Sequence, residues 1–162
     1  MIRFVPESSR KNLTFQMGWF TMWLGVTIVA LFLSPDPRGH GTHTQLGLPP
    51  CATAAVTGRP CPGCGLTTSF ASTVRGNLAG AWRSNPFGVP LYLLFTASAL
   101  ASVYGFWKKL RMDCSSRSFN FALGALLVVY VGFGLVRFFT SPYPETTLIQ
   151  MALKDSPSNQ AR

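Results

Sequence analysis

LTFQMGWFTMWLGVTIVALFL, residues Leu13–Leu33, is a run of 21 residues without a charge. A helix rises about 1.5 Å per residue, so about 20 apolar residues cross the roughly 30 Å hydrocarbon core of a bilayer. The backbone of such a segment has to satisfy its own hydrogen bonds, which a helix does. The run is too long for the apolar part of a signal peptide, and no small-residue cleavage pattern follows it. It therefore predicts a retained transmembrane helix at 13–33.

Two further apolar runs have the same character. They are FGVPLYLLFTASALASVYGFW at 87–107, which is uncharged, and FALGALLVVYVGFGLVRFF at 121–139, which contains Arg137. Each predicts a transmembrane helix, so we expect an all-α integral membrane protein with three spans. Arg137 lies about one turn from the end of its run. It either extends to the membrane surface or binds a polar group inside the membrane.

The composition supports a membrane location. Charged residues make up 12% of the chain and apolar residues 48%, whereas soluble domains carry about 25% charged residues. The net charge of +9 does not indicate a nucleic-acid partner, because the basic residues flank the apolar runs. We interpret them as topology signals and as contacts to anionic headgroups, so the expected partner is the lipid bilayer.

The positions of the basic residues predict the orientation. The compact basic segments, which should stay in the cytoplasm, contain Arg3, Arg10, Lys11, Lys108, Lys109, Arg111 and Arg117. We therefore expect the segments at 1–12 and 108–120 on the cytoplasmic side of the membrane. The loop at 34–86 and the tail at 140–162, whose end should be disordered, are expected outside the cytoplasm.

A cysteine turn and a helix are predicted within the long loop. In CPGCG at 61–65, proline stiffens the backbone and glycine permits positive φ, so two thiols can point to one side. Apolar side chains then recur at every fourth position, namely Leu66, Phe70, Val74, Leu78 and Trp82. This period predicts an amphipathic helix over 66–84, broken near Gly76 or Gly80, that lies in the membrane interface.

The loop cysteines admit three interpretations. Cys51, Cys61 and Cys64, with His43 or alternatively His40, have the ligand types of a Cys₃His zinc site. The same thiols at a helix N-terminus could serve thiol redox chemistry. They could also form a structural disulfide or pack as small apolar side chains. Cys114 lies in the predicted cytoplasmic loop, where we expect a free thiol without a role.

The loop and the span after it resemble a bacterial membrane family catalogued as domain of unknown function 2752. The resemblance covers about 51–107 and rests on Cys51, Thr57-Gly58, Cys61-Pro62, Cys64-Gly65, Thr67, Gly76, Ala81 and Asn85-Pro86. Many members carry Arg where this chain has Thr68. The resemblance implies a small membrane protein and singles out this loop, but it implies no reaction.

The sequence contains no carboxylate pair, Ser/His/Asp arrangement or phosphate-binding loop, so we do not expect an enzyme. The leading hypothesis is a structural or accessory membrane subunit with a rigid cysteine turn, and zinc is the candidate cofactor. The alternative is a protein for thiol–disulfide exchange or metal handling. Ala97, Ala101 and Gly105 form a small-residue ridge, which should pack against glycines of the third span or against a partner subunit.

The predicted orientation can be tested through Cys114. A membrane-impermeant thiol reagent should leave Cys114 unlabelled in intact cells, because the basic loop around it should be cytoplasmic. Permeabilised cells should show labelling, which provides the control. Labelling of Cys114 in intact cells would reverse the orientation.

Overall fold

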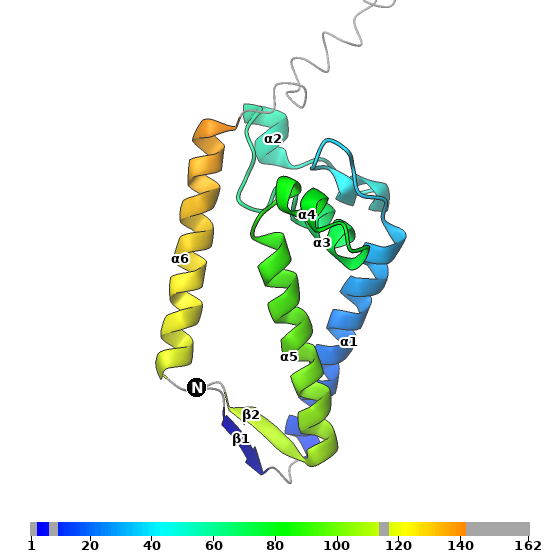
Figure 1. Cartoon of the computed structure of the whole chain (residues 1–162), viewed down its shortest axis with the longest axis vertical. Helices are drawn as coiled ribbons and strands as arrows, with labels where there is room; N and C mark the ends of the chain where they lie inside the picture. Colours follow the sequence, from blue (N-terminus) through cyan, green and yellow to red (C-terminus); the bar gives the residue numbers. More distant parts are fainter. Residues whose placement is uncertain (1–2, 7–9, 114–116, 142–162) are drawn as a thin grey trace, which may run out of the picture.

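The structure, a computed structural model, describes residues 3–6, 10–113 and 117–141. Its three long helices are α1 (Arg10–Phe32), α5 (Gly88–Lys108) and α6 (Arg117–Thr140), shown in Figure 1. Each is long and apolar enough to cross a membrane. The predicted class, an all-α protein with three candidate spans, is confirmed. Cys114 and the predicted disordered end of the tail lie outside the described residues.

Helices α1 and α5 pack along their length through a ladder of polar side chains. Its rungs are hydrogen bonds of 2.9–3.0 Å: Trp19 Nε1 to Ser98 Oγ, Trp23 Nε1 to Thr96 Oγ1, and Thr27 Oγ1 with the Tyr92 hydroxyl. Just beyond the end of α5, Gln16 Nε2 donates to the Leu110 carbonyl at 2.9 Å. Hydrocarbon provides little hydrophobic drive between helices, so hydrogen bonds and close packing hold such a pair together.

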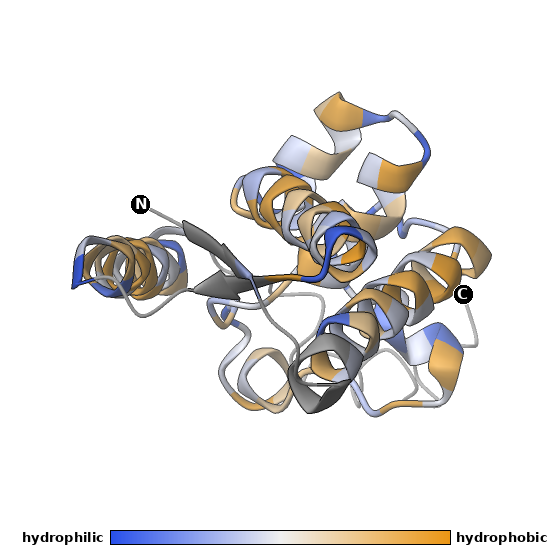
Figure 2. Cartoon of the chain, turned by 90° about the horizontal axis from the view of Figure 1, so that it is seen from below, coloured by the Kyte–Doolittle hydropathy of each residue, from blue (hydrophilic) through white to orange (hydrophobic). Residues whose placement is uncertain are grey.

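The small residues of α5 do not form the single packing ridge that we expected. Gly105 is buried, and a Cβ there would lie 2.8 Å from the Leu110 carbonyl oxygen, but Ala97 is exposed. On α6, a Cβ at Gly124 or Gly132 would meet nothing within 4 Å. Helix α6 stands apart from α1 and α5 along most of its length (Figures 1 and 2). A partner subunit at the ridge stays a prediction.

A short antiparallel ribbon, which the sequence did not predict, joins two segments at the lower end of the helices. Strand β1 (Arg3–Pro6) pairs with β2 (Leu110–Asp113), with Arg3 opposite Asp113 and Pro6 opposite Leu110. The segment before α1 and the segment after α5 therefore meet at one end of the molecule (Figure 1).

The segment between α1 and α5 forms a compact cap at the other end. It contains the 3-10 helix η1 (Thr42–Leu46) and the helices α2 (Ala52–Thr57), α3 (Leu66–Val74) and α4 (Leu78–Ser84). The chain turns between α3 and α4 at Gly76, whose φ is +75°.

The predicted break near Gly76 is present, but the amphipathic character predicted over 66–84 is not confirmed. The chain forms two helices there, and their buried side chains are small: Thr68, Ser69, Ala71, Ser72, Ala81 and Ser84. Two members of the apolar stripe, Leu78 and Trp82, are 55% and 58% exposed. The small polar residues face inward because close approach allows them to hydrogen-bond. Ser69 Oγ, for example, donates to the Asn85 carbonyl at 3.1 Å. Placement at the membrane interface stays a prediction.

The polar ladder makes a quantitative prediction for the Thr27–Tyr92 pair. The near-isosteric changes Thr27→Val and Tyr92→Phe should show a coupling energy of about 0.6 kcal/mol, the average for hydrogen bonds between membrane helices. A double-mutant cycle of unfolding free energies in detergent or bicelles measures it. Thr27→Val with Tyr104→Phe is the control pair and should be additive. Additivity in both cycles would show that the 2.9 Å contact contributes nothing.

Candidate metal centre

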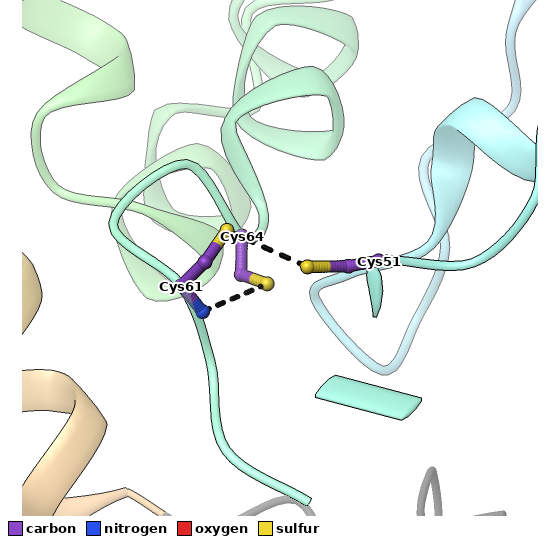
Figure 3. Close-up of side chains that lie close together, drawn as sticks. All are labelled: Cys51, Cys61 and Cys64. Carbon is purple, nitrogen blue, oxygen red and sulfur yellow. Dashed lines mark hydrogen bonds between the residues drawn. The ribbon is translucent and has the colours of Figure 1, made fainter. Parts of the chain in front are cut away.

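Three cysteine thiols converge at the cap. The Sγ atoms of Cys51, Cys61 and Cys64 all lie within 4.8 Å of one another, and those of Cys51 and Cys61 are 3.5 Å apart. None of the three forms a disulfide. Cys51 is the N-cap of α2, and it points across at the turn that carries the other two (Figure 3). Three groups that can each donate a sulfur ligand thus come together from two segments of the loop.

The turn at Cys61–Gly65 has the backbone that its sequence predicts. Cys64 N–H donates to the Cys61 carbonyl at 3.0 Å, and Cys61 N–H donates to Cys64 Sγ at 3.2 Å. Gly65, with φ of +80°, ends the turn and begins α3. A Cβ at Gly65 would clash with the carbonyl oxygens of Ser84 and Gly39. Only glycine fits this combination of positive φ and close backbone approach.

Asn85 fastens the turn to the start of α5. Its side chain is fully buried, and Nδ2 donates to the carbonyls of Cys64 at 3.1 Å and Pro62 at 3.3 Å. Its Oδ1 accepts from Phe87 N–H at 3.0 Å. The Asn85 side chain thus satisfies two backbone carbonyls and one backbone N–H, groups that are costly to bury without a hydrogen-bond partner. In the sequence, Asn85-Pro86 belongs to the motif of the family resemblance and is predicted to form the turn into the second apolar span, which was the one signal of this role.

Arg137 binds the same turn from α6. Its Nη1 donates to the Cys64 carbonyl at 3.2 Å, and its Nη2 donates to the Ser84 carbonyl at 3.3 Å. Arg137 therefore has polar partners in the cap, and its two interpretations, extension to the membrane surface and a polar partner inside the membrane, stay predictions. The guanidinium also lies 5.8 Å from the centre of the Phe133 ring, within the range of cation–π attraction.

Helix α6 meets the cap at three further points. A Cβ at Gly134 would clash with Pro62, the Tyr130 hydroxyl lies 3.7 Å from the Cβ position of Gly63, and Arg59 Nη1 donates to the Phe138 carbonyl at 2.9 Å. The glycine at 134 thus allows α6 to approach the cysteine turn closely.

The surroundings affect two of the thiols in opposite ways. Burial raises the pKa of the Cys64 thiol, and its hydrogen bond with Cys61 raises it further. Burial also acts to raise the pKa of Cys51, but hydrogen bonds from the backbone of Ala54 and from the Cys61 thiol outweigh it and lower that pKa below its ordinary value. The thiolate therefore forms more readily at Cys51 than at Cys64.

A pocket of 240 Å³ adjoins the thiols, and both candidate histidines line it with the three cysteines. The Nε2 atom of His43 lies 3.2 Å from the Pro49 carbonyl oxygen, in hydrogen-bond contact. Neither histidine belongs to the group of ligand atoms within 4.8 Å. Within the described part of the chain, the structure brings the predicted cysteines together and leaves His43 and His40 at the edge of the same pocket.

A comparison with known protein families matches the part of the chain that contains the three cysteines. Residues 51–99 match the model of a family described as a protein of unknown function (DUF2752), which confirms the resemblance. No curated protein and no solved structure matches the chain. The matched segment begins at Cys51 and contains the cysteine turn, α3, α4 and the first half of α5.

Asn85 should control the accessibility of Cys64. Asn85→Ala removes the donor to the part-buried Pro62 carbonyl and one donor to the Cys64 carbonyl, which should cost about 1–3 kcal/mol of unfolding free energy. It should also speed the reaction of Cys64 with a thiol reagent in a Cys114→Ser background, because the turn loosens. Unfolding in detergent and mass spectrometry of labelled peptides measure the two effects.

Asn77→Ala is the matched control for this change. Asn77 is exposed, and its Oδ1 accepts from Gly80 N–H at 2.9 Å at the start of α4. Its loss should cost about 1 kcal/mol as a helix cap but leave Cys64 labelling unchanged. Equal labelling rates in the two variants would contradict the role of Asn85.

Proposed function

We propose that Cys51, Cys61 and Cys64 bind a zinc ion as thiolates and that the protein is a structural or accessory membrane subunit built around this site. The observation that supports it is the convergence of three Sγ atoms within 4.8 Å. Zn–S bonds of about 2.3 Å place the sulfurs of a tetrahedral site roughly 3.7 Å apart. The observed separations, 3.5 Å for Cys51 and Cys61 and no more than 4.8 Å for the other pairs, need only a small adjustment to reach that geometry.

The fourth ligand in this proposal is His43, with His40 as the alternative. Both line the pocket beside the thiols, and an imidazole completes a Cys₃His set, which is common for structural zinc. His43 would exchange its contact with the Pro49 carbonyl for the metal. A zinc ion with three thiolates and one imidazole carries one net negative charge, which suits a site whose Cys64 carbonyl accepts from Arg137.

The proposed role follows from what the cluster joins. The cysteine turn contacts α5 through Asn85 and α6 through Arg137, and Cys51 adds α2. A metal there would fix these elements relative to one another and present a rigid surface. From the distribution of basic residues, this surface would face the outside of a bacterial inner membrane.

A second candidate function is thiol–disulfide chemistry. It is favoured by the 3.5 Å separation of Cys51 and Cys61 Sγ and by the lowered pKa of Cys51. A disulfide requires about 2.05 Å between the sulfurs. A small movement would allow this bond to form by exchange with the disulfide of a partner, which takes up the two electrons and two protons and leaves as two thiols. The third thiol would then remain reduced.

Single substitutions separate the two functions. Cys51→Ser, Cys61→Ser and Cys64→Ser should each release most of the zinc, because a site loses most of its affinity with one ligand. The double change Cys61→Ser/Cys64→Ser should be little less stable than either single, since the ligands act as one unit. Metal analysis and thermal unfolding of detergent-purified protein measure both, with Cys114→Ser as the control that keeps the metal.

Three results would contradict the zinc proposal. The first is purified protein that carries no metal and contains a Cys51–Cys61 disulfide. The second is a mild effect of Cys51→Ser beside severe effects of the other two. The third is a set of three mild and additive effects, which would show that the thiols pack as ordinary small side chains.

A further inference from the structure

A second pocket, separate from the thiols, lies between α1 and α3. It has a volume of 410 Å³, and its lining consists of Gly25, Val26, Val29, Ala30, Leu33, Leu66, Thr67 and Phe70. Thr67 provides the one polar side chain of this lining. The volume falls in the range of about 300–1,000 Å³ that is usual for small-molecule sites. We call this pocket the α1–α3 groove.

The length and position of the groove fit one hydrocarbon chain. Its lining on α1 runs from Gly25 to Leu33, which is about 12 Å along a helix axis. One leaflet contributes about 15 Å of hydrocarbon, half of the roughly 30 Å core. Gly25 and Val29 are exposed, so the groove opens on the surface that a candidate span presents to lipid. An extended acyl chain of that leaflet therefore has the right length and access.

A basic side chain lies at the end of the groove. Arg75 Nη1 donates to the Ala30 carbonyl at 2.8 Å, and Nη2 donates to the Leu31 carbonyl at 2.5 Å. Ala30 itself lines the groove. The side-chain partners of Arg75 in the described part of the chain are carbonyl groups, so no carboxylate there neutralises its charge. Arg75 is exposed and retains N–H groups for an anion.

We propose that the α1–α3 groove binds one acyl chain of an anionic phospholipid, whose phosphate contacts Arg75. The acyl chain fills the apolar lining of the groove, and the phosphate provides a negatively charged partner for Arg75. This site is independent of any metal at the cysteines. The bound lipid would fill the space between α1 and α3. The polar ladder joins α1 to α5 separately.

The test uses the full chain in nanodiscs that contain phosphatidylcholine and a trace of phospholipid with a diazirine on its acyl chain. After irradiation, mass spectrometry maps the labelled peptides. Photoreactive phosphatidylglycerol should label the peptides of 25–33 and 66–70 above those of α5 and α6. It should do so about five-fold more than photoreactive phosphatidylcholine, as expected for one basic residue near an anionic headgroup.

Matched variants test the two halves of the site. Val29→Trp should fill the groove and abolish the local labelling, whereas Ile28→Trp, also at an exposed position of α1 but outside the lining, should not. Gly25→Leu is a second filling variant, because a Cβ at Gly25 meets nothing within 4 Å. Arg75→Gln should remove the preference for phosphatidylglycerol and Arg75→Lys should keep it. Arg83→Gln, at an exposed position of α4, should also leave the preference for phosphatidylglycerol unchanged.

Each result decides the proposal. Even labelling over α1, α5 and α6 would show bulk lipid contact only and would overturn it. Equal labelling of Val29→Trp and Ile28→Trp would overturn the acyl-chain site. Equal labelling by the two headgroups, or loss of preference in Arg83→Gln as well as Arg75→Gln, would overturn the contact between phosphate and Arg75.

Discussion

The buried amide of Asn85 is the interaction on which the cap depends. The Asn85 side chain is short and carries two N–H donors and an acceptor oxygen. It satisfies the Pro62 and Cys64 carbonyls and the Phe87 N–H together. Those groups belong to the cysteine turn and to the first turn of α5, so one side chain fixes the turn on a membrane-spanning helix. Two glycines allow close packing around this contact. A Cβ at Gly65 would clash with the Ser84 and Gly39 carbonyls, and a Cβ at Gly88 would clash with the Ser69 side chain. The fixed turn positions two of the three thiols, those of Cys61 and Cys64.

Polar side chains occupy much of the interior of the protein. Fully or nearly buried side chains include Gln16, Thr42, Thr68, Ser69, Ser72, Asn85 and Ser102, whereas many large apolar residues of the spans are exposed. A membrane protein has this distribution because lipid solvates apolar side chains but not polar ones. Two arginines satisfy backbone carbonyls at helix ends. Arg75 donates to carbonyls at the end of α1, and Arg59 donates to those at the end of α6. Cations at a helix C-terminus also complement its dipole.

Hydropathy was sufficient to predict the three spans, because length and lack of charge determine membrane crossing almost alone. It misled for 66–84, where the apolar stripe was assumed to mark one helix face and the small polar residues were the ones that packed inward. The ribbon was missed because β1 and β2 are four residues each and far apart in the sequence. For the site, the spacing of Cys61 and Cys64 predicted their turn, but the approach of Cys51 depends on the placement of α2. The partners of Arg137 are likewise set by tertiary contacts that a single sequence does not encode locally.

The separate position of α6 has a consequence for the order of assembly. Helix α6 contacts the cap at residues that all precede it in the chain, namely Arg59, Pro62, Gly63, Cys64, Ser84 and Phe87. During synthesis the earlier segments emerge first and can fold before later ones. The α1–α5 pair and the cysteine turn can therefore form while α6 is still being made, and α6 can only attach to a turn that already exists. A chain with a misfolded cap therefore lacks the contacts that would hold α6.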